Sequence, residues 1–471
     1  MRYDWDKLES FLTEILQKHA VPGAAICVSD DTGVLYSRGF GHRDADGRKP
    51  VTPETVFVVA SMSKSITCMA AALLEHEGKL SFDDPVTKYL PSFRIPGTPQ
   101  ETVQVHHLAN HTTGIPPLPT LSWSLAWNTA SEPWNKQILE QYRAESKTRV
   151  EHVNDIIDFI AQDGELRVLG PPGKYMSYLN DGYALLSSII DKAAGETLES
   201  YVDRRIFQPL GMDRSSFALN TVMAKGNITS LFIKDGDGVL RCSDNWDNAP
   251  PYRGCGWIKS TALDMNKYYM ALAGRGIHEG SRVFPESCIE RVIGRSFAET
   301  KKGTYCYGLS KRLFEDVAIC EHSGGLTGVS SRGGFIRDGA YAVTLLTNLS
   351  GIDCSPLTNA AFNMRLGLPL EQSHMWAEEV WADKLEEPLI YTGVYSSRES
   401  RQEQIIISTN DSGKLICQGE KGSEPIVFCG GNVFISSGSG EVLPPGLVLQ
   451  FHAYNGQCEM VSVGSRIYQK S

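Results

Sequence analysis

The sequence predicts an α+β fold followed by a small all-β domain. Two hairpin patterns of alternating apolar residues stand far apart in the chain, one near its start and one after residue 330. The expected strands are 24–29 with 34–39, and 334–337 with 341–347. Helical spacing of apolar residues places a helix next to each hairpin, over 5–19 and over 356–366. A single antiparallel sheet assembled from both ends of a domain explains this order.

The remaining chain divides into a helical middle and a β-rich end. From about 60 to 300 the sequence is mostly helical and rich in loops, so we expect an all-α lobe inserted between the two halves of the sheet. After residue 388, short β-rich runs alternate with Gly, Ser and Asn turns, which is typical of a small barrel or sandwich. The expected domains are 1–368 and 388–471, joined by an acidic linker over 369–387.

Composition and charge argue against several classes of function. A net charge of -10 disfavours nucleic acid or an anionic membrane as the main partner. No apolar run approaches the roughly 18 residues of a membrane span. The first ten residues are charged and lack the apolar core of a signal peptide, so we expect a cytoplasmic protein. The eleven cysteines form no C-x-x-C pair, so neither a disulfide framework nor a zinc site is expected.

The first chemical motif is an S-x-x-K box made by Ser61 and Lys64 at the start of an amphipathic helix. Because three residues make nearly one helical turn, the lysine amine stands beside the serine hydroxyl. The unpaired N–H groups and partial positive charge of a helix N-terminus favour an activated nucleophile at this place. Taken alone, the box is also explained by a serine that caps a helix and a lysine at the surface.

A second motif combines Tyr178 with Asn180 in a loop that leads into a helix over 183–193. The two residues offer a phenol and an amide on one side of the chain. A lysine ammonium beside a phenol favours its ionised form, so Tyr178 could exchange protons near neutral pH. A core tyrosine next to a capping asparagine would explain the same residues.

The third motif is the run His322, Ser323, Gly324 and Gly325, just before the late hairpin. Glycines in an edge strand let a substrate backbone approach closely, and a backbone N–H there can contribute to an oxyanion hole. A tight bend with a satisfied histidine is the alternative. Each motif is weak alone, but the three in this order and on these elements make a strong combination.

Together the motifs resemble the serine β-lactamase and penicillin-binding-protein superfamily, in the class-C-like branch with D-aminopeptidases and carboxylesterases. The matching positions are Ser61 to Lys64 for S-x-x-K, Tyr178 to Asn180 for Y-x-N, His322 to Gly324 in place of K-T-G, and secondary signatures at 108–114, 172–173 and 254–264. The resemblance covers about residues 5–366 and implies a β-lactamase/transpeptidase-like sheet flanked by helices. The C-terminal β module lies outside it.

This resemblance also implies a role for each residue on the nucleophile side. Ser61 attacks a carbonyl and becomes acylated, while Lys64 removes or relays its proton. Tyr178 protonates the leaving group and later activates water. Asn180 orients the amide or ester of the substrate. The resemblance implies neither a metal nor an organic cofactor.

Across the cleft, the resemblance places His322 near the leaving group or a substrate carboxylate. The N–H groups of Ser61 and Gly325 would form the oxyanion hole, with Ser323 and Gly324 beside it. A lysine at position 322 would anchor a carboxylate at any pH, whereas a histidine is largely neutral near about pH 7. This difference makes a true β-lactamase less favoured.

A stretch between Gly114 and Pro171, between the first and second motifs, fits no known pattern but holds Trp123, Trp127 and Trp134. Aromatic residues in a loop near a cleft could form a lid or an apolar acyl pocket. Ordinary packing of the helical lobe explains them equally well.

The resulting hypothesis is a serine hydrolase that acts through an acyl-enzyme on small amides or peptides, including those with D-residues, or on esters. The D-preference follows from the resemblance alone. Acyl transfer, with thioesterase-type release or cyclisation, would use the same intermediate. A catalytically idle binding protein is less favoured because all the motif residues are retained. The β module could shape the cleft or join subunits of a homo-oligomer.

Overall fold

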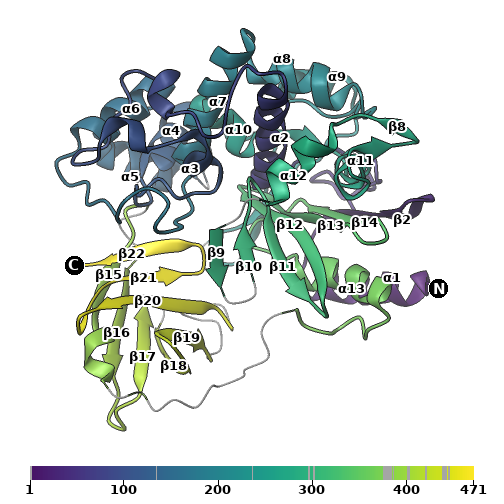
Figure 1. Ribbon diagram of the computed structural model, residues 1–471. Helices are drawn as coiled ribbons and strands as arrows, with labels where there is room; N and C mark the ends of the chain where they lie inside the picture. The colour runs from purple at the N-terminus through teal and green to yellow at the C-terminus, as the bar shows by residue number, and fades with distance from the viewer. Residues whose placement is uncertain are drawn as a thin grey trace.

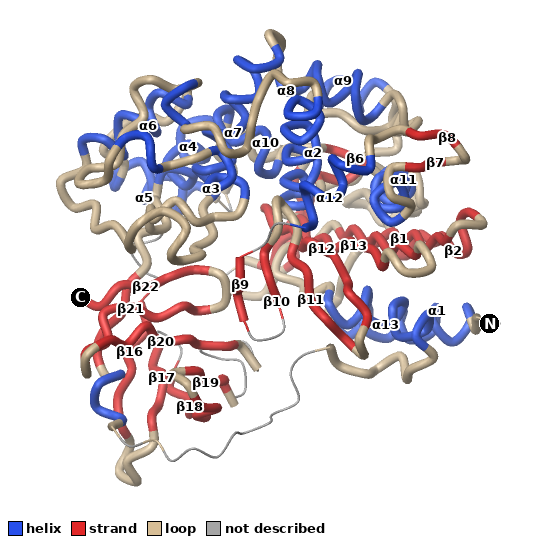
Figure 2. Tube along the Cα trace, in the orientation of Figure 1, coloured by secondary structure: helices blue, strands red, loops and turns tan. Residues whose placement is uncertain are grey.

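The computed structural model comprises a helical region, a large antiparallel sheet and a β-barrel (Figure 1). It describes residues 3–133, 135–235, 237–294, 297–300, 303–374, 385, 387–399, 404–419, 422–437, 443 and 446–471. Most of the predicted linker, residues 369–387, therefore lies outside the described residues. Figure 2 shows most labelled helices above the large sheet, with α1 (Trp5–Lys18) and α13 (Ser355–Leu366) below it, and the barrel strands at the lower left.

In the described part of the chain, the large sheet has eight strands in the order β2-β1-β14-β13-β12-β11-β10-β9. The strands are β1 (Gly23–Asp30), β2 (Gly33–Gly41), β9 (Phe297–Thr300), β10 (Gly303–Tyr305), β11 (Ser310–Phe314), β12 (Val317–Leu326), β13 (Val329–Ile336) and β14 (Tyr341–Thr347). The first strand pairs with the last, with Cys27 opposite Thr344. The two chain segments thus meet in one antiparallel sheet, which confirms the predicted α+β arrangement.

Helices cover both faces of this sheet, so β1 is buried almost along its whole length. Helices α1 (Trp5–Lys18) and α13 (Ser355–Leu366) pack on one face, against Ile26 and Val343. The neighbouring residue Cys27 points to the opposite face and joins the larger core beneath the helical lobe. Period-two alternation in a strand buried on both sides therefore contributes to two hydrophobic cores, one on each face of the large sheet.

The central element of the helical region is α2 (Ser63–His76), which is buried from Ser63 to Leu74. A helix that is apolar nearly all round belongs inside a large core, and this one lies between other helices and the sheet (Figure 1). The other helices of this region are α3 (Val105–Ala109), α4 (Thr120–Asn128), α5 (Lys136–Glu145), α6 (Val153–Gln162), α7 (Asn180–Ala194), α8 (Leu198–Val202), α9 (Leu219–Ala224), α10 (Arg253–Gly256), α11 (Ala262–Ala273) and α12 (Glu286–Gly294).

Three short strand pairs brace the loops of this region. They are β3 (Phe57–Val58) with β6 (Lys259–Ser260), β4 (Leu231–Lys234) with β5 (Leu240–Ser243), and β7 (Ile277–His278) with β8 (Ser281–Arg282). In the first pair, β3 lies shortly before α2 in the chain and β6 just before α11, so the pair ties together the segments that lead into these two helices. No helix among the described residues is both long and apolar enough to cross a bilayer.

The C-terminal strands close into a barrel, which settles the choice between barrel and sandwich that the sequence left open. Its strands are β15 (Gly393–Ser396), β16 (Gln404–Thr409), β17 (Leu415–Gly419), β18 (Gly422–Gly430), β19 (Val433–Ser436), β20 (Val448–Tyr454), β21 (Gln457–Val463) and β22 (Arg466–Lys470). Pairing of β15 with β22 completes the circle, with Tyr395 opposite Lys470. A cluster of aromatic rings that includes Tyr391, Phe434 and Phe451 fills the interior.

Candidate active site

Ser61 lies in a short 3₁₀ turn, η1 (Ala60–Met62), that leads directly into α2. The structure thus places it just before the helix rather than as a simple helix cap. Ala60 has a φ of 48°, a left-handed conformation that a residue with a side chain rarely adopts. Ala60 and Met62, the residues on either side of Ser61, are fully buried, whereas Ser61 is half-buried. A strained residue next to a partly exposed serine is a pattern that concentrates at reactive sites.

The Lys64 ammonium is fully buried and fixed by two hydrogen bonds. Its Nζ donates to the Ser61 Oγ at 3.0 Å and to the carbonyl of Cys255, in α10, at 2.8 Å. Close packing of α10 makes the second contact possible, because a Cβ on Gly254 would lie only 2.2 Å from the Ser187 Oγ. The surface-lysine alternative is therefore wrong, and the predicted Ser61–Lys64 contact is present.

Tyr178 joins this pair through the face of its ring. The Lys64 Nζ lies 4.9 Å from the centroid of the Tyr178 ring and 5.3 Å from that of Tyr183. Such a cation–π contact is favourable where water is excluded. Asn180, the first residue of α7, is half-buried two residues further on. The structure therefore brings together the first two predicted motifs.

His111 fixes the backbone on both sides of Tyr178. Its carbonyl accepts from the N–H of Ser177 at 2.9 Å, and its Nδ1 accepts from the N–H of Leu179 at 3.0 Å. Its ring centroid lies 4.3 Å from that of Tyr178. Burial, reinforced by the positive charge of Lys64, holds the pKa of His111 well below its usual value. The sequence showed this residue only as part of a secondary signature.

The third motif lies on an open strand edge. The pairing of β11 with β12 ends at Ser310 opposite Glu321, while β13 continues to pair with β12 up to Leu326. Among the described residues, the segment 322–326 is thus hydrogen-bonded to a strand on one side only. This edge is the geometry expected for binding an extended substrate backbone.

The two glycines of this segment face opposite directions. A Cβ on Gly324 would lie 2.5 Å from the Val59 carbonyl oxygen, so only glycine lets β12 approach the turn that carries Ser61. A Cβ on Gly325 would meet no atom within 4 Å. Ser323, Gly324 and Gly325 are therefore brought beside η1 as predicted. Their role in an oxyanion hole stays a prediction.

His322 is a neutral imidazole, and the hydrogen bonds of its two ring nitrogens define its tautomer. Its Nδ1 must donate to the Ser323 carbonyl, which leaves Nε2 to accept from the Tyr305 hydroxyl at 2.9 Å. Burial, with Lys64 as the next cause, lowers the pKa of His322 to about 3. Because both nitrogens are occupied and the ring is uncharged, His322 is poorly suited to anchor a carboxylate.

Tyr305, on β10, is a site residue that sequence analysis missed. Its ring packs against His111 at a centroid distance of 4.8 Å and against Tyr178 at 6.2 Å. It therefore links the histidine of the third motif to the tyrosine of the second. No spacing rule connects residue 305 with residue 178, because the sheet alone brings β10 to the helical lobe.

The barrel also reaches this site, although it lies outside the part of the chain that the family resemblance covers. The turn between β21 and β22 docks on the segment of Tyr178, whose N–H donates to the Ser465 carbonyl at 2.7 Å. The N–H of Ile467 donates to the Ser177 Oγ at 3.1 Å. Arg466 lies between them, with its guanidinium 5.0 Å from the centroid of the Tyr178 ring. Glu399 holds this guanidinium through two hydrogen bonds.

The structure gives a different answer for each of the three tryptophans that were candidates for a lid or pocket. Trp123 is 3% exposed, packs edge-to-face on Phe159 at 5.1 Å and lines a cavity between the helical lobe and the barrel. Trp127 packs under Arg143 and Arg149, which is ordinary packing within the helical lobe. Trp134 lies outside the described residues. Among the described tryptophans, the pocket hypothesis therefore remains for Trp123 alone.

Comparisons with known proteins identify the family. The beta-lactamase family model matches residues 8–361, so the chain belongs to the beta-lactamase family. This confirms the resemblance drawn from the motifs. Within the described residues, no group of three His, Cys, Asp or Glu side chains is arranged to hold a metal ion.

Curated relatives include enzymes and penicillin-binding proteins. The chain is 23% identical to a D-aminopeptidase of Brucella anthropi over 427 residues, which is 90% of this chain and 72% of that protein. It is 29% identical to penicillin-binding protein 4* of Bacillus subtilis over 208 residues, 44% of this chain. The chain spans 40% of that protein and 50% of the Staphylococcus aureus protein flp, to which it is 28% identical. Family membership and these relatives support a serine hydrolase.

Solved structures match nearly the whole chain, as two examples show. The octameric penicillin-binding protein homologue from Pyrococcus abyssi is 25% identical, with a TM-score of 0.69 over 99% of this chain and 100% of that one. SurE is 20% identical, with a TM-score of 0.73 over 99% and 98%. At that identity, the second match shows the shared fold alone.

The neutral state of His322 predicts a pH dependence of stability. An unfolded histidine titrates near 6.5, whereas the folded pKa is about 3, so between these values only the unfolded chain binds this proton. The free energy of unfolding should therefore fall as the pH drops from about 6.5 towards 3, with a share of a few kcal/mol from His322. Urea denaturation of the wild type and of His322→Gln should show a shallower decline in the variant. Parallel declines would contradict the assignment.

A second prediction concerns Arg466. Replacing it with glutamine removes the contact with the Tyr178 ring, so kcat/KM should fall about three- to tenfold. The matched control is Lys414→Gln, an exposed lysine on a barrel turn, which should keep the wild-type rate. Steady-state kinetics on an activated ester would measure both. An Arg466→Gln enzyme with wild-type kcat/KM would show that the barrel hairpin does not influence the site.

Proposed function

We propose that the protein is a serine hydrolase that forms a covalent acyl-enzyme on small amides, peptides or esters. The observation that carries this proposal is the 3.0 Å contact between the Ser61 Oγ and the buried Lys64 Nζ. In this proposal Ser61 attacks the substrate carbonyl, and Lys64, in its unprotonated amine form, takes or relays the proton of the serine hydroxyl. A half-buried serine on a strained turn, with a fixed amine beside it, suits this role.

Tyr178 is the proposed acid and base for the leaving group and for water. It stands over the Lys64 ammonium, and the His111 contacts hold its backbone in place. Asn180 is proposed to orient the substrate from the N-terminus of α7. The N–H groups of Ser61 and Gly325 are the proposed oxyanion hole. The loss of one such donor typically lowers the rate about 100- to 1,000-fold.

The proposed substrate class is an uncharged amide or ester at the reacting end. A neutral His322 offers no cation to the carboxylate that a β-lactam carries, so β-lactam hydrolysis is disfavoured. A preference for D-residues is supported by the relatives, among them a D-aminopeptidase and a D-stereospecific amidohydrolase from Streptomyces sp.. The octameric state of the Pyrococcus abyssi homologue supports a homo-oligomer as a further proposal.

One observation favours acyl transfer as the second candidate function. The barrel hairpin covers the segment of Tyr178, which is only 9% exposed and packs with Met176 and Tyr305. A site from which water is largely excluded would let an acceptor amine or alcohol compete with hydrolysis. In this proposal the catalytic domain is 1–368, and the barrel domain, 388–471, completes its site.

The test is a panel of p-nitrophenyl esters, D- and L-amino-acid amides and a chromogenic β-lactam. The wild type should turn over esters or D-amides, and the β-lactam should be the poorest substrate. Ser61→Ala should lose at least about 1,000-fold in kcat/KM. The matched control is Ser63→Ala, which removes a hydroxyl two residues away whose Oγ accepts from the N–H of Ile258. Equal loss in both variants, or retained activity in Ser61→Ala, would overturn the proposal.

A further inference from the structure

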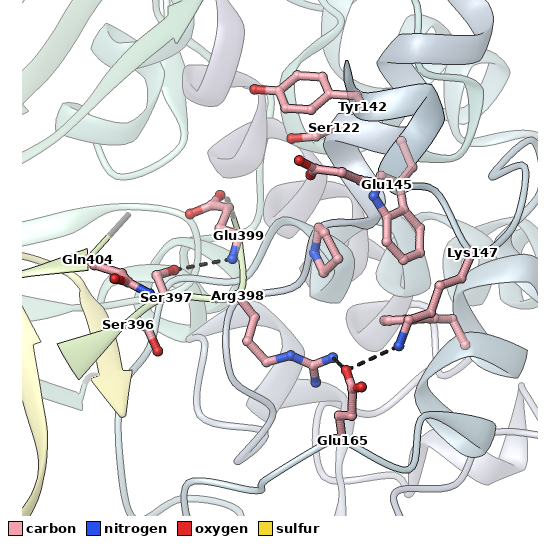
Figure 3. A pocket seen from close by; sticks show the side chains of 13 residues that line it. Ser122, Tyr142, Glu145, Lys147, Glu165, Ser396, Ser397, Arg398, Glu399 and Gln404 are labelled. Carbon is pink, nitrogen blue, oxygen red and sulfur yellow. Dashed lines mark hydrogen bonds and ion pairs between the residues drawn. The ribbon is translucent and has the colours of Figure 1, made fainter. Parts of the chain in front are cut away.

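A cavity of about 240 Å³ lies between the helical lobe and the barrel. Figure 3 shows the side chains that line it. The helices α4 and α5 contribute Ser122, Tyr142 and Glu145, and the C-terminal domain contributes Ser397, Glu399 and Gln404. A charged group of Arg398, Glu165 and Lys147 lies on a further side. Pockets for drug-sized ligands span roughly 300–1,000 Å³, so this one suits a single side chain or a small amine.

The floor of the cavity is aromatic. Trp123 and Phe159 pack edge-to-face at 5.1 Å, and Tyr142, on α5, lines the same cavity. Aromatic faces of this kind bind the apolar body of a ligand and also attract a cation through their ring quadrupoles. The hydroxyl groups of Ser122 and Ser397 add polar contacts at the rim.

The charges around the cavity leave one carboxylate uncompensated. Arg398 pairs with Asp163 at 2.5 Å, and Lys147 pairs with Glu165 at 3.1 Å, so the two lining cations already have partners. Glu399 is engaged with Arg466. Glu145, by contrast, accepts from Gln141 at 3.2 Å and forms an ion pair with no described residue. The cavity therefore favours a positively charged ligand over an anion.

Two chains of contacts connect the cavity with the candidate active site. On the barrel side, Glu399 lines the cavity and holds Arg466, which lies 5.0 Å from the centroid of the Tyr178 ring. On the lobe side, Pro119 lines the cavity, and the next residue, Thr120, donates to Asp181 at 2.5 Å. Asp181 follows Asn180 in α7. Both chains thus end at the segment 178–181.

We propose that this cavity is a substrate subsite for an amine-bearing group with an apolar body. The proposal rests on the proposed function, in which Tyr178 serves the leaving group. The cavity would then receive the distal part of that group, such as a basic or aminoalkyl-aromatic side chain, or the matching part of an acceptor amine. Glu145 would meet the ammonium, and Trp123 with Phe159 would bind the apolar body.

The test uses two probes of nearly equal size, the phenethylammonium ion and the neutral 2-phenylethanol. Calorimetric titration of the full-length protein at about pH 7 should show about five- to tenfold tighter binding of the cation. Glu145→Gln should remove this preference, because glutamine keeps the contact with Gln141 but carries no charge. Equal affinities for both probes in the wild type, or a preference that persists in Glu145→Gln, would overturn the proposal.

Two further variants control for indirect effects. Glu140→Gln removes an exposed carboxylate from the same helix and should keep the preference. Ser122→Trp places a large side chain in the cavity and should weaken both probes about tenfold or more, with a melting temperature near that of the wild type confirming the fold. Unchanged binding to a folded Ser122→Trp protein would show that the probes bind elsewhere, and would contradict the assignment.

Kinetics separate this inference from the proposed function. Phenethylammonium should compete with a p-nitrophenyl ester in the wild type, because both occupy the leaving-group side. Binding without competition would refute the subsite. The same titration on Ser61→Ala needs no turnover, so it should still show the cation preference. If Ser61→Ala retains hydrolysis, the acyl-enzyme proposal fails, whatever the titrations show for the cavity.

Discussion

The placement of the Lys64 ammonium is the constraint on which the rest of the site depends. This ammonium is completely buried, and in the described part of the chain it forms no ion pair with a carboxylate. A buried cation of this kind is tolerated only where oxygen acceptors and polarisable faces replace water. Here the Ser61 hydroxyl, the Cys255 carbonyl and two tyrosine rings fulfil that need. The turn η1, α10 and α7 must therefore hold fixed positions around one atom.

The same requirement explains why Tyr178 is held so firmly. Its ring covers the ammonium, and its flanking backbone N–H groups are bonded to His111, while its own N–H is bonded to the barrel. Tyr305 and His322 complete the surrounding shell without adding charge. The site thus places the buried Lys64 Nζ beside the serine among neutral groups, and the Arg466 guanidinium, paired with Glu399, lies near the same Tyr178 ring. Such an arrangement suits a proton exchange in which Lys64, in its unprotonated amine form, takes the hydroxyl proton of Ser61.

Short-range patterns revealed the sheet, the helices and the three motifs because periodicity and spacing act over a few residues. The S-x-x-K spacing predicted the Ser61–Lys64 contact correctly, although the left-handed Ala60 moved the serine into a turn before the helix. The contributions of Tyr305 and Arg466 were not readable, because each depends on how β10 or the barrel docks against the helical lobe. The tautomer of His322 could not be predicted from the sequence either, because it depends on the Tyr305 phenol that the sheet brings to Nε2.

The most direct test of this account is the rate at which a fluorophosphonate modifies Ser61, followed by intact-protein and peptide mass spectrometry. The wild type should add one phosphonyl group, mapped to Ser61. Lys64→Met, which keeps the length and apolar stem of the side chain but removes the amine, should slow this step by at least about 100-fold while the protein stays folded. A folded Lys64→Met protein that is modified at the wild-type rate, or wild-type protein modified at another residue, would contradict the central claim.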